Sequence, residues 1–86
     1  MKIKKEVVLR KVAGESILVP LGETVEQYNG VFVLTPTAEL LWRAIENGAD
    51  EKGLVLALLS EYDVKAEKAA ADVSEFLEKL SAFGII

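Results

Sequence analysis

The sequence predicts an α+β domain, in which an antiparallel sheet is followed by helices that cover one of its faces. Before Thr35, short runs rich in β-branched residues alternate with turn residues, and after it apolar residues recur at helical spacing. Strands that precede helices are typical of this class. With 86 residues, 51% of them hydrophobic, the chain can bury a single core, so we expect one domain over residues 1–86.

Two strands joined by a hairpin are expected first. Glu6–Ala13 has an imperfect alternation of side chains, and Gly14-Glu15 is predicted to form the turn. Ser16–Leu21 is predicted as the second strand. Because proline cannot donate a hydrogen bond to a ladder, Pro20 is expected either to face an edge of the sheet or to mark the end of this strand.

The segment Gly22–Gly30 leaves two alternatives open. Val25–Tyr28 could pair with the following strand across Asn29-Gly30, a strong hairpin signal, or the whole segment could be a loop. We expect the loop. Val31–Leu34 is predicted as the third strand.

Three helices are then expected. Thr35 is a suitable N-cap with Pro36 at the first helical position, and Asn47-Gly48 ends this helix in a left-handed cap. Its buried stripe includes Trp42, whose indole N–H is expected to find a partner.

The second and third helices follow closely. Asp50 can cap a helix that runs to about Glu61, and the third helix extends from about Lys65 to Ala82, with Gly84 as its breaker. The third helix has a wide apolar stripe, formed by Ala66, Ala69, Ala70, Val73, Phe76, Leu77, Leu80 and Phe83.

Several function classes are disfavoured by composition. With no His and no Cys, the chain lacks a His-based triad, a thiol nucleophile and an ordinary zinc site, although a carboxylate or Ser/Lys mechanism stays open. A net charge of −4 opposes nonspecific DNA binding. No apolar run suits a membrane span or a signal peptide. We therefore expect a cytoplasmic, non-enzymatic protein that needs no cofactor and no metal.

The strand Val31–Leu34 has two interpretations. It could be only core, but alternation means that Phe32 and Leu34 face the side opposite to Val31 and Val33. With helices on one face only, one pair should be partly exposed. A short apolar strand at a sheet edge can accept an added peptide strand. The third helix could likewise only pack on the core, or its flank could line a groove.

Four segments of the chain, GESILVP, LTPTAELLW, LLSEYDV and ADVSEFLEKLSAFGII, follow one another in an order that resembles a known family. This family is that of the PqqD-like peptide-recognition domains of ribosomal peptide maturation, and the similarity covers about Val7–Ile86. The sequence departs from the family pattern at Thr35, where Asn is usual, at Gly53, and in the length of the Gly22–Gly30 loop.

The resemblance implies a winged-helix-like fold, with three antiparallel strands followed by three helices. It also implies that the chain captures the leader of a precursor peptide as an added strand and presents it to a modifying enzyme, often a radical S-adenosylmethionine (SAM) protein. The peptide-binding residues would be Val31, Phe32, Val33, Leu34, Asp72, Val73, Phe76, Lys79 and Leu80.

Two other functions remain to be distinguished. One is a winged-helix regulator that acts on DNA or on another protein, which the acidic last helix makes less favourable. The other is a self-associating module, because a free sheet edge or the N-terminal hairpin could also pair or exchange with a second copy. We expect a monomer or an edge-paired or swapped dimer.

Overall fold

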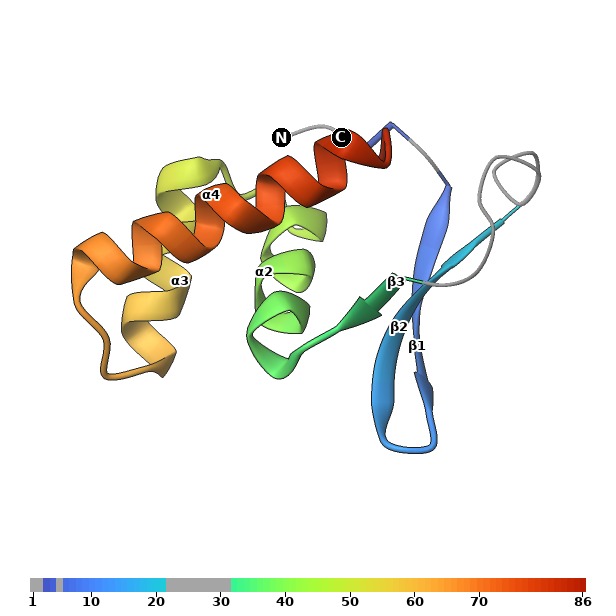
Figure 1. Ribbon diagram of the computed structural model, residues 1–86, viewed down its shortest axis with the longest axis horizontal. Helices are drawn as coiled ribbons and strands as arrows, with labels where there is room; N and C mark the ends of the chain where they lie inside the picture. The colour runs from blue at the N-terminus through green and yellow to red at the C-terminus, as the bar shows by residue number, and fades with distance from the viewer. Residues whose placement is uncertain (1–2, 5, 22–31) are drawn as a thin grey trace.

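The computed structural model describes residues 3–4, 6–21 and 32–86. Three strands precede three helices in this part of the chain, and Figure 1 shows the helices gathered to one side of the sheet. The elements are β1 (Val7–Val12), β2 (Glu15–Pro20), β3 (Phe32–Leu34), α2 (Pro36–Glu46), α3 (Glu51–Glu61) and α4 (Ala66–Ala82). The predicted α+β class is therefore confirmed. The expectations for Gly22–Gly30 and Val31 fall outside the described residues.

The sheet is antiparallel, with β2 between β1 and β3. The hairpin turn lies at Ala13-Gly14, where φ is +51° and +83°, so the prediction of Gly14-Glu15 was wrong by one residue. Glu15 instead pairs with Val12 at the end of the ladder. Two positive φ angles give the type I′ turn that matches strand twist, and Ala13 gave no sequence signal for it because alanine disfavours that conformation.

The helix ends follow the predicted capping signals. The Thr35 hydroxyl accepts a hydrogen bond from the Ala38 N–H at 3.1 Å, and the Asp50 carboxylate accepts one from the Gly53 N–H at 2.8 Å. Gly48 follows α2 with φ +91° and Gly84 follows α4 with φ +72°. These glycines let the chain leave each helix and return toward the core.

Most of the core lies among the three helices, with Leu18 and Leu34 contributed by the sheet, and Trp42 within it has no exposed surface. The indole Nε1 has no hydrogen-bond partner among the residues that the structure describes, so the predicted partner is not found there. The other buried hydrophobic residues are Leu18, Leu34, Leu41, Ile45, Leu54, Leu58, Ala69, Val73, Phe76, Leu80 and Ile85.

The two ends of the described chain meet. The Lys4 N–H donates to the Ile85 carbonyl at 2.6 Å, and Ile85 is buried. This contact anchors the segment after α4 beside the segment before β1. Within the described residues, no helix combines the length and the apolar character that crossing a membrane would require.

Candidate functional site

Among the strands that the structure describes, β3 forms one edge of the sheet, and the register shows which of its backbone groups are not used in pairing with β2. The Leu21 N–H donates to the Glu6 carbonyl at 2.8 Å, and these residues lie opposite each other beyond the Val7–Pro20 pair. Antiparallel ladders alternate between hydrogen-bonded and non-hydrogen-bonded pairs. The odd-numbered residues of β2 therefore bond to β1, and the even-numbered residues bond to β3.

This alternation leaves the backbone of Val33 directed away from the sheet. Leu34 and Phe32 lie opposite Ser16 and Leu18, the β2 residues that bond toward β3. Val33 lies opposite Ile17, which bonds toward β1. We infer that the N–H and C=O of Val33 point to the open edge, where an added strand would find them.

The side chains of β3 also alternate. Leu34 is buried at 4% exposure and Phe32 packs partly against the core, whereas Val33 is 56% exposed. The expectation that one side of this strand faces solvent is therefore confirmed for the described residues.

One face of helix α4 carries a row of side chains that reaches β3 at one end. Asp72, Phe76, Lys79 and Phe83 are spaced by four, three and four residues, which places them on one helix face. At one end of the row the ring of Phe83 meets that of Phe32, with ring centroids 5.2 Å apart and planes inclined by 73°. The row therefore reaches the described start of β3.

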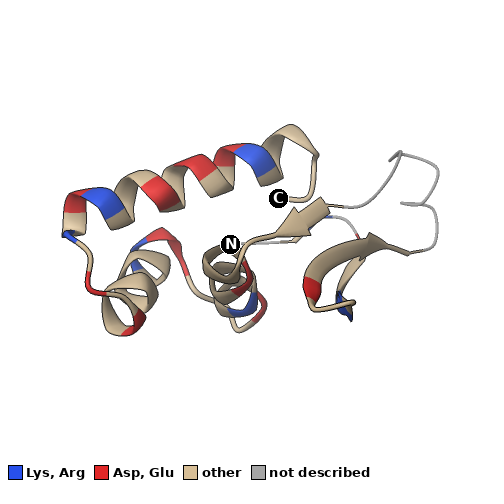
Figure 2. Cartoon of the chain, turned by 60° about the horizontal axis from the view of Figure 1, so that its bottom comes forward, with Lys and Arg blue, Asp and Glu red and all other residues tan. Residues whose placement is uncertain are grey.

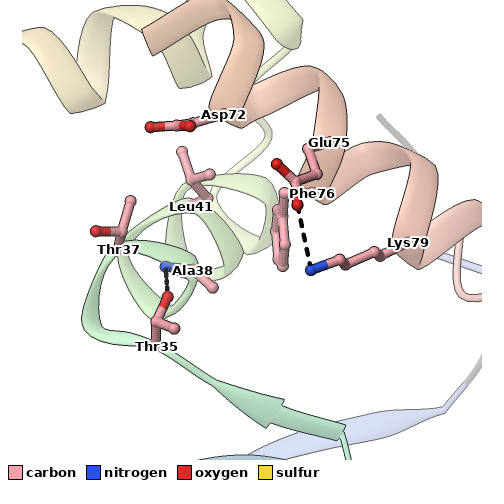
Figure 3. Close-up of a pocket in the computed structure, with 8 residues that line it drawn as sticks. All are labelled: Thr35, Thr37, Ala38, Leu41, Asp72, Glu75, Phe76 and Lys79. Carbon is pink, nitrogen blue, oxygen red and sulfur yellow. Dashed lines mark hydrogen bonds and ion pairs between the residues drawn. The ribbon is translucent and has the colours of Figure 1, made fainter. Parts of the chain in front are cut away.

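At the other end of this row lies a pocket between α4 and the first turns of α2 (Figure 3). Its volume is about 270 Å³. Ala38, Leu41 and Phe76 contribute apolar surface, and the other lining residues are polar or charged. The full set is Thr35, Thr37, Ala38, Leu41, Asp72, Glu75, Phe76 and Lys79. Such a mixed surface suits an apolar side chain flanked by polar groups.

The charges around the pocket are paired along α4. Asp72 binds Lys68 at 3.1 Å, and Glu75 binds Lys79 at 3.5 Å. Figure 2 shows acidic residues along this helix, with basic residues near its two ends. This surface offers no continuous basic stripe for phosphates, which is unfavourable for a nucleic-acid interface.

The predicted site residues divide into three groups. Phe32 and Val33 lie on the edge strand, and Asp72, Phe76 and Lys79 line the pocket. Leu34, Val73 and Leu80 are buried, so their side chains support the site from the core. Val31 is outside the described residues.

Five lining residues were not among the predicted peptide-binding residues, namely Thr35, Thr37, Ala38, Leu41 and Glu75. Ala38 and Leu41 share the helical spacing of the buried residues Trp42 and Ile45, which is typical of core positions, and Glu75 lies outside the apolar stripe of α4. The pocket arises where the start of α2 meets α4, and no periodicity within one helix reports such a meeting.

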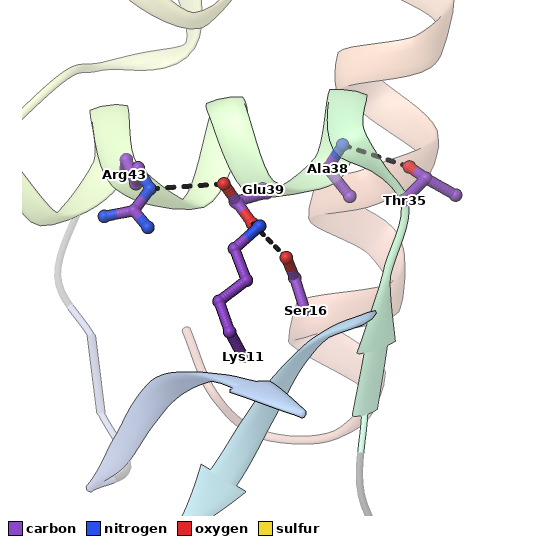
Figure 4. A network of polar contacts seen from close by, with 6 residues as sticks. All are labelled: Lys11, Ser16, Thr35, Ala38, Glu39 and Arg43. Atoms are coloured by element: carbon purple, nitrogen blue, oxygen red, sulfur yellow. Dashed lines mark hydrogen bonds and ion pairs between the residues drawn. The ribbon is translucent and has the colours of Figure 1, made fainter. Parts of the chain in front are cut away.

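A polar network fixes the hairpin to α2 (Figure 4). The Glu39 carboxylate accepts a hydrogen bond from the Ser16 hydroxyl, and it pairs with Lys11 at 2.6 Å and Arg43 at 3.4 Å. The hydrogen bonds from Lys11 and Ser16 are the main cause that lowers the Glu39 pKa from 4.5 to about 2. This network holds β2 beside α2, and so it helps to position β3 between them.

The remaining chemistry of the described residues is limited. No three His, Cys, Asp or Glu side chains come together there as metal ligands would. The arrangement of an open strand edge, an aromatic contact and a pocket is suited to binding an extended chain.

Comparisons with known proteins give two findings. The family model of coenzyme PQQ synthesis protein D (PqqD) matches residues 15–86. A solved structure, "TbiB1 in Complex with the TbiA(beta) Leader Peptide", is similar with a TM-score of 0.80 and 25% sequence identity, covering 99% of this chain and 93% of that one. Comparison with curated proteins finds no match.

Proposed function

Because this chain belongs to the PqqD family, we propose that it is a non-catalytic accessory protein that binds the leader of a ribosomally made precursor peptide. The leader adds to the sheet beside β3 and lies against α4. The observation that carries this proposal is the open edge at Val33 next to the pocket. The similar structure of TbiB1, which was solved with a leader peptide, supports it.

Strand addition explains how the site combines affinity with selectivity. Hydrogen bonds to the Val33 backbone are indifferent to the peptide sequence. A peptide residue opposite Val33 points, like Val33, away from the helices, and the residues on either side of it point toward α4. Selection therefore falls on alternate peptide positions, which meet the pocket near Phe76 and the aromatic pair of Phe32 and Phe83.

The bound leader is presented to a modifying enzyme, for which we propose a radical SAM protein. The domain contributes no reacting group in this scheme. It raises the effective concentration of the precursor beside the enzyme, and linked binding of this kind increases apparent affinity without new contacts. We place the encounter in the cytoplasm.

Val33→Pro tests the proposal. Proline removes the N–H directed to the free edge, whereas the bonds between β2 and β3 come from Phe32 and Leu34. Losing a backbone hydrogen bond worth about 1 kcal/mol should raise the dissociation constant for the leader about fivefold to tenfold. Calorimetric titration with the leader of the protein's own precursor measures this.

Val33→Ala is the matched control, because it shortens the same side chain and keeps the N–H. Circular dichroism should show that both variants are folded. Equal leader affinity of Val33→Pro and Val33→Ala would count against strand addition.

A further inference from the structure

The face of the sheet turned away from the helices is unusually apolar. Antiparallel sheets with one covered face commonly place polar residues on the other. Ser16 and Leu18 are buried on the helix side, so the residues between and beyond them in β2, and their partners in β1 and β3, face outward. Five of these outward residues are aliphatic, namely Val8, Val12, Ile17, Val19 and Val33.

This outer face is a surface and is not part of the core. None of its five aliphatic side chains packs against the core cluster. Val12 is 54% exposed and Val33 is 56% exposed, whereas Val8, Ile17 and Val19 are half-buried. A contiguous aliphatic patch of this kind is typical of an interaction site.

Two opposite charges lie on the same face. Arg10 is opposite Ile17, and Glu15 is opposite Val12. Neither makes an ion pair within the described part of the chain. The outer face is thus neutral in sum, while the whole chain carries a net charge of −4. Two copies would repel each other least if they met through this face.

We propose that the outer face binds a second copy of this chain. In an isologous interface each contact occurs twice with the partners exchanged. Arg10 of either copy can then meet Glu15 of the other, so the face supplies its own complementary charges. The aliphatic residues between them provide the buried surface.

The size of the face sets the strength of this association. Three strands spaced about 4.8 Å apart and up to six residues long cover roughly 14 by 20 Å. That is about 300 Å² for each copy, against about 800 Å² in stable interfaces. The dimer is therefore weak and forms at high local concentration. It leaves the β3 edge and the pocket open, unlike a dimer paired through that edge.

The first test compares two exposed aliphatic residues. Val12 is 54% exposed on the outer face, and Leu56 is 57% exposed on α3. Sedimentation equilibrium of the native chain up to about 1 mM should show reversible dimerisation. Val12→Lys should raise the dissociation constant about tenfold or more, and Leu56→Lys should leave it close to native.

The second test uses the two charges. Arg10→Glu places two acidic residues on the face, and Glu15→Arg places two basic residues there. Like charges would then meet in a dimer of either variant, so each variant alone should be monomeric. An equimolar mixture should associate, because both cross-contacts are then complementary. Circular dichroism should show that all variants are folded.

Neither test adds a peptide, so the results bear on self-association and not on the proposed peptide binding. A native chain that stays monomeric throughout the range overturns it. So does a dimer that Leu56→Lys weakens as much as Val12→Lys, because another surface then forms it. A mixture that associates no better than its two components rejects the Arg10–Glu15 contact.

Discussion

Glu39 is the residue on which the junction between hairpin and helix depends. Its side chain is 18% exposed, forms ion pairs with Lys11 and Arg43, and accepts a hydrogen bond from the Ser16 hydroxyl. The pKa of about 2 means that the folded protein binds the proton less readily than the unfolded chain, whose value is near 4.5. The stabilisation from this carboxylate is therefore complete above about pH 4.5 and is lost as the pH falls toward 2.

Glu39→Gln should lower the free energy of unfolding at pH 7, because an amide replaces the charged partner of Lys11. The variant should also lose less stability than the native protein when the pH falls from 4.5 to 2. Urea unfolding across this pH range measures both effects. Glu46→Gln is a suitable control, since Glu46 is exposed on the same helix. Parallel pH profiles for native protein and Glu39→Gln would show that the network does not couple protonation to folding.

Among the elements, the β1–β2 hairpin carries the clearest local strain. Ala13 has φ +51°, a conformation that costs an L-residue with a Cβ about 1–2 kcal/mol. Asparagine tolerates it better, and Asn-Gly is the preferred type I′ pair. Ala13 therefore disfavours the backbone conformation that the hairpin turn requires of it.

Ala13→Asn should raise the free energy of unfolding by about 0.5–1 kcal/mol. Gly14→Ala should lower it, and the backbone is the cause, because a Cβ at Gly14 meets no atom within 4 Å and φ there is +83°. Chemical denaturation of both variants measures the difference. Finding Ala13→Asn less stable than the native chain would show that the turn is not the type I′ form.

The strand–helix junction shows what sequence can predict at this scale. Thr35 and Pro36 mark the start of α2 by hydrogen-bonding chemistry that is local, and the structure confirms it. Alternation in β3 is equally local, so the exposure of one side of the strand could be expected, but the packing of the helices decides that this side is the one of Val33. The hairpin turn could not be placed correctly, because tertiary and sheet constraints hold Ala13 in a conformation it disfavours.

In the whole molecule, only some of the residues predicted to bind a peptide come together at one surface. Phe76 and Lys79 were expected near a groove and do line the pocket. Val73 and Leu80 lie on the same helix but have no exposed surface, because they belong to the buried core. Thr37 and Leu41 belong to a second helix, and only the packing of α2 against α4 brings them to the site. Distances between elements are the information that a single sequence lacks.

The central claim is that an extended leader peptide pairs with β3 and lies against α4. Titrating the leader of the protein's own precursor into isotopically labelled protein, and following backbone amide signals by NMR, tests it most directly. The account predicts that the signals of Phe32, Val33 and Leu34 shift together with those of Asp72, Phe76, Lys79 and Phe83. Signals on α3, such as that of Leu56, should stay in place. A saturating leader that leaves the β3 and α4 signals unmoved would contradict the account.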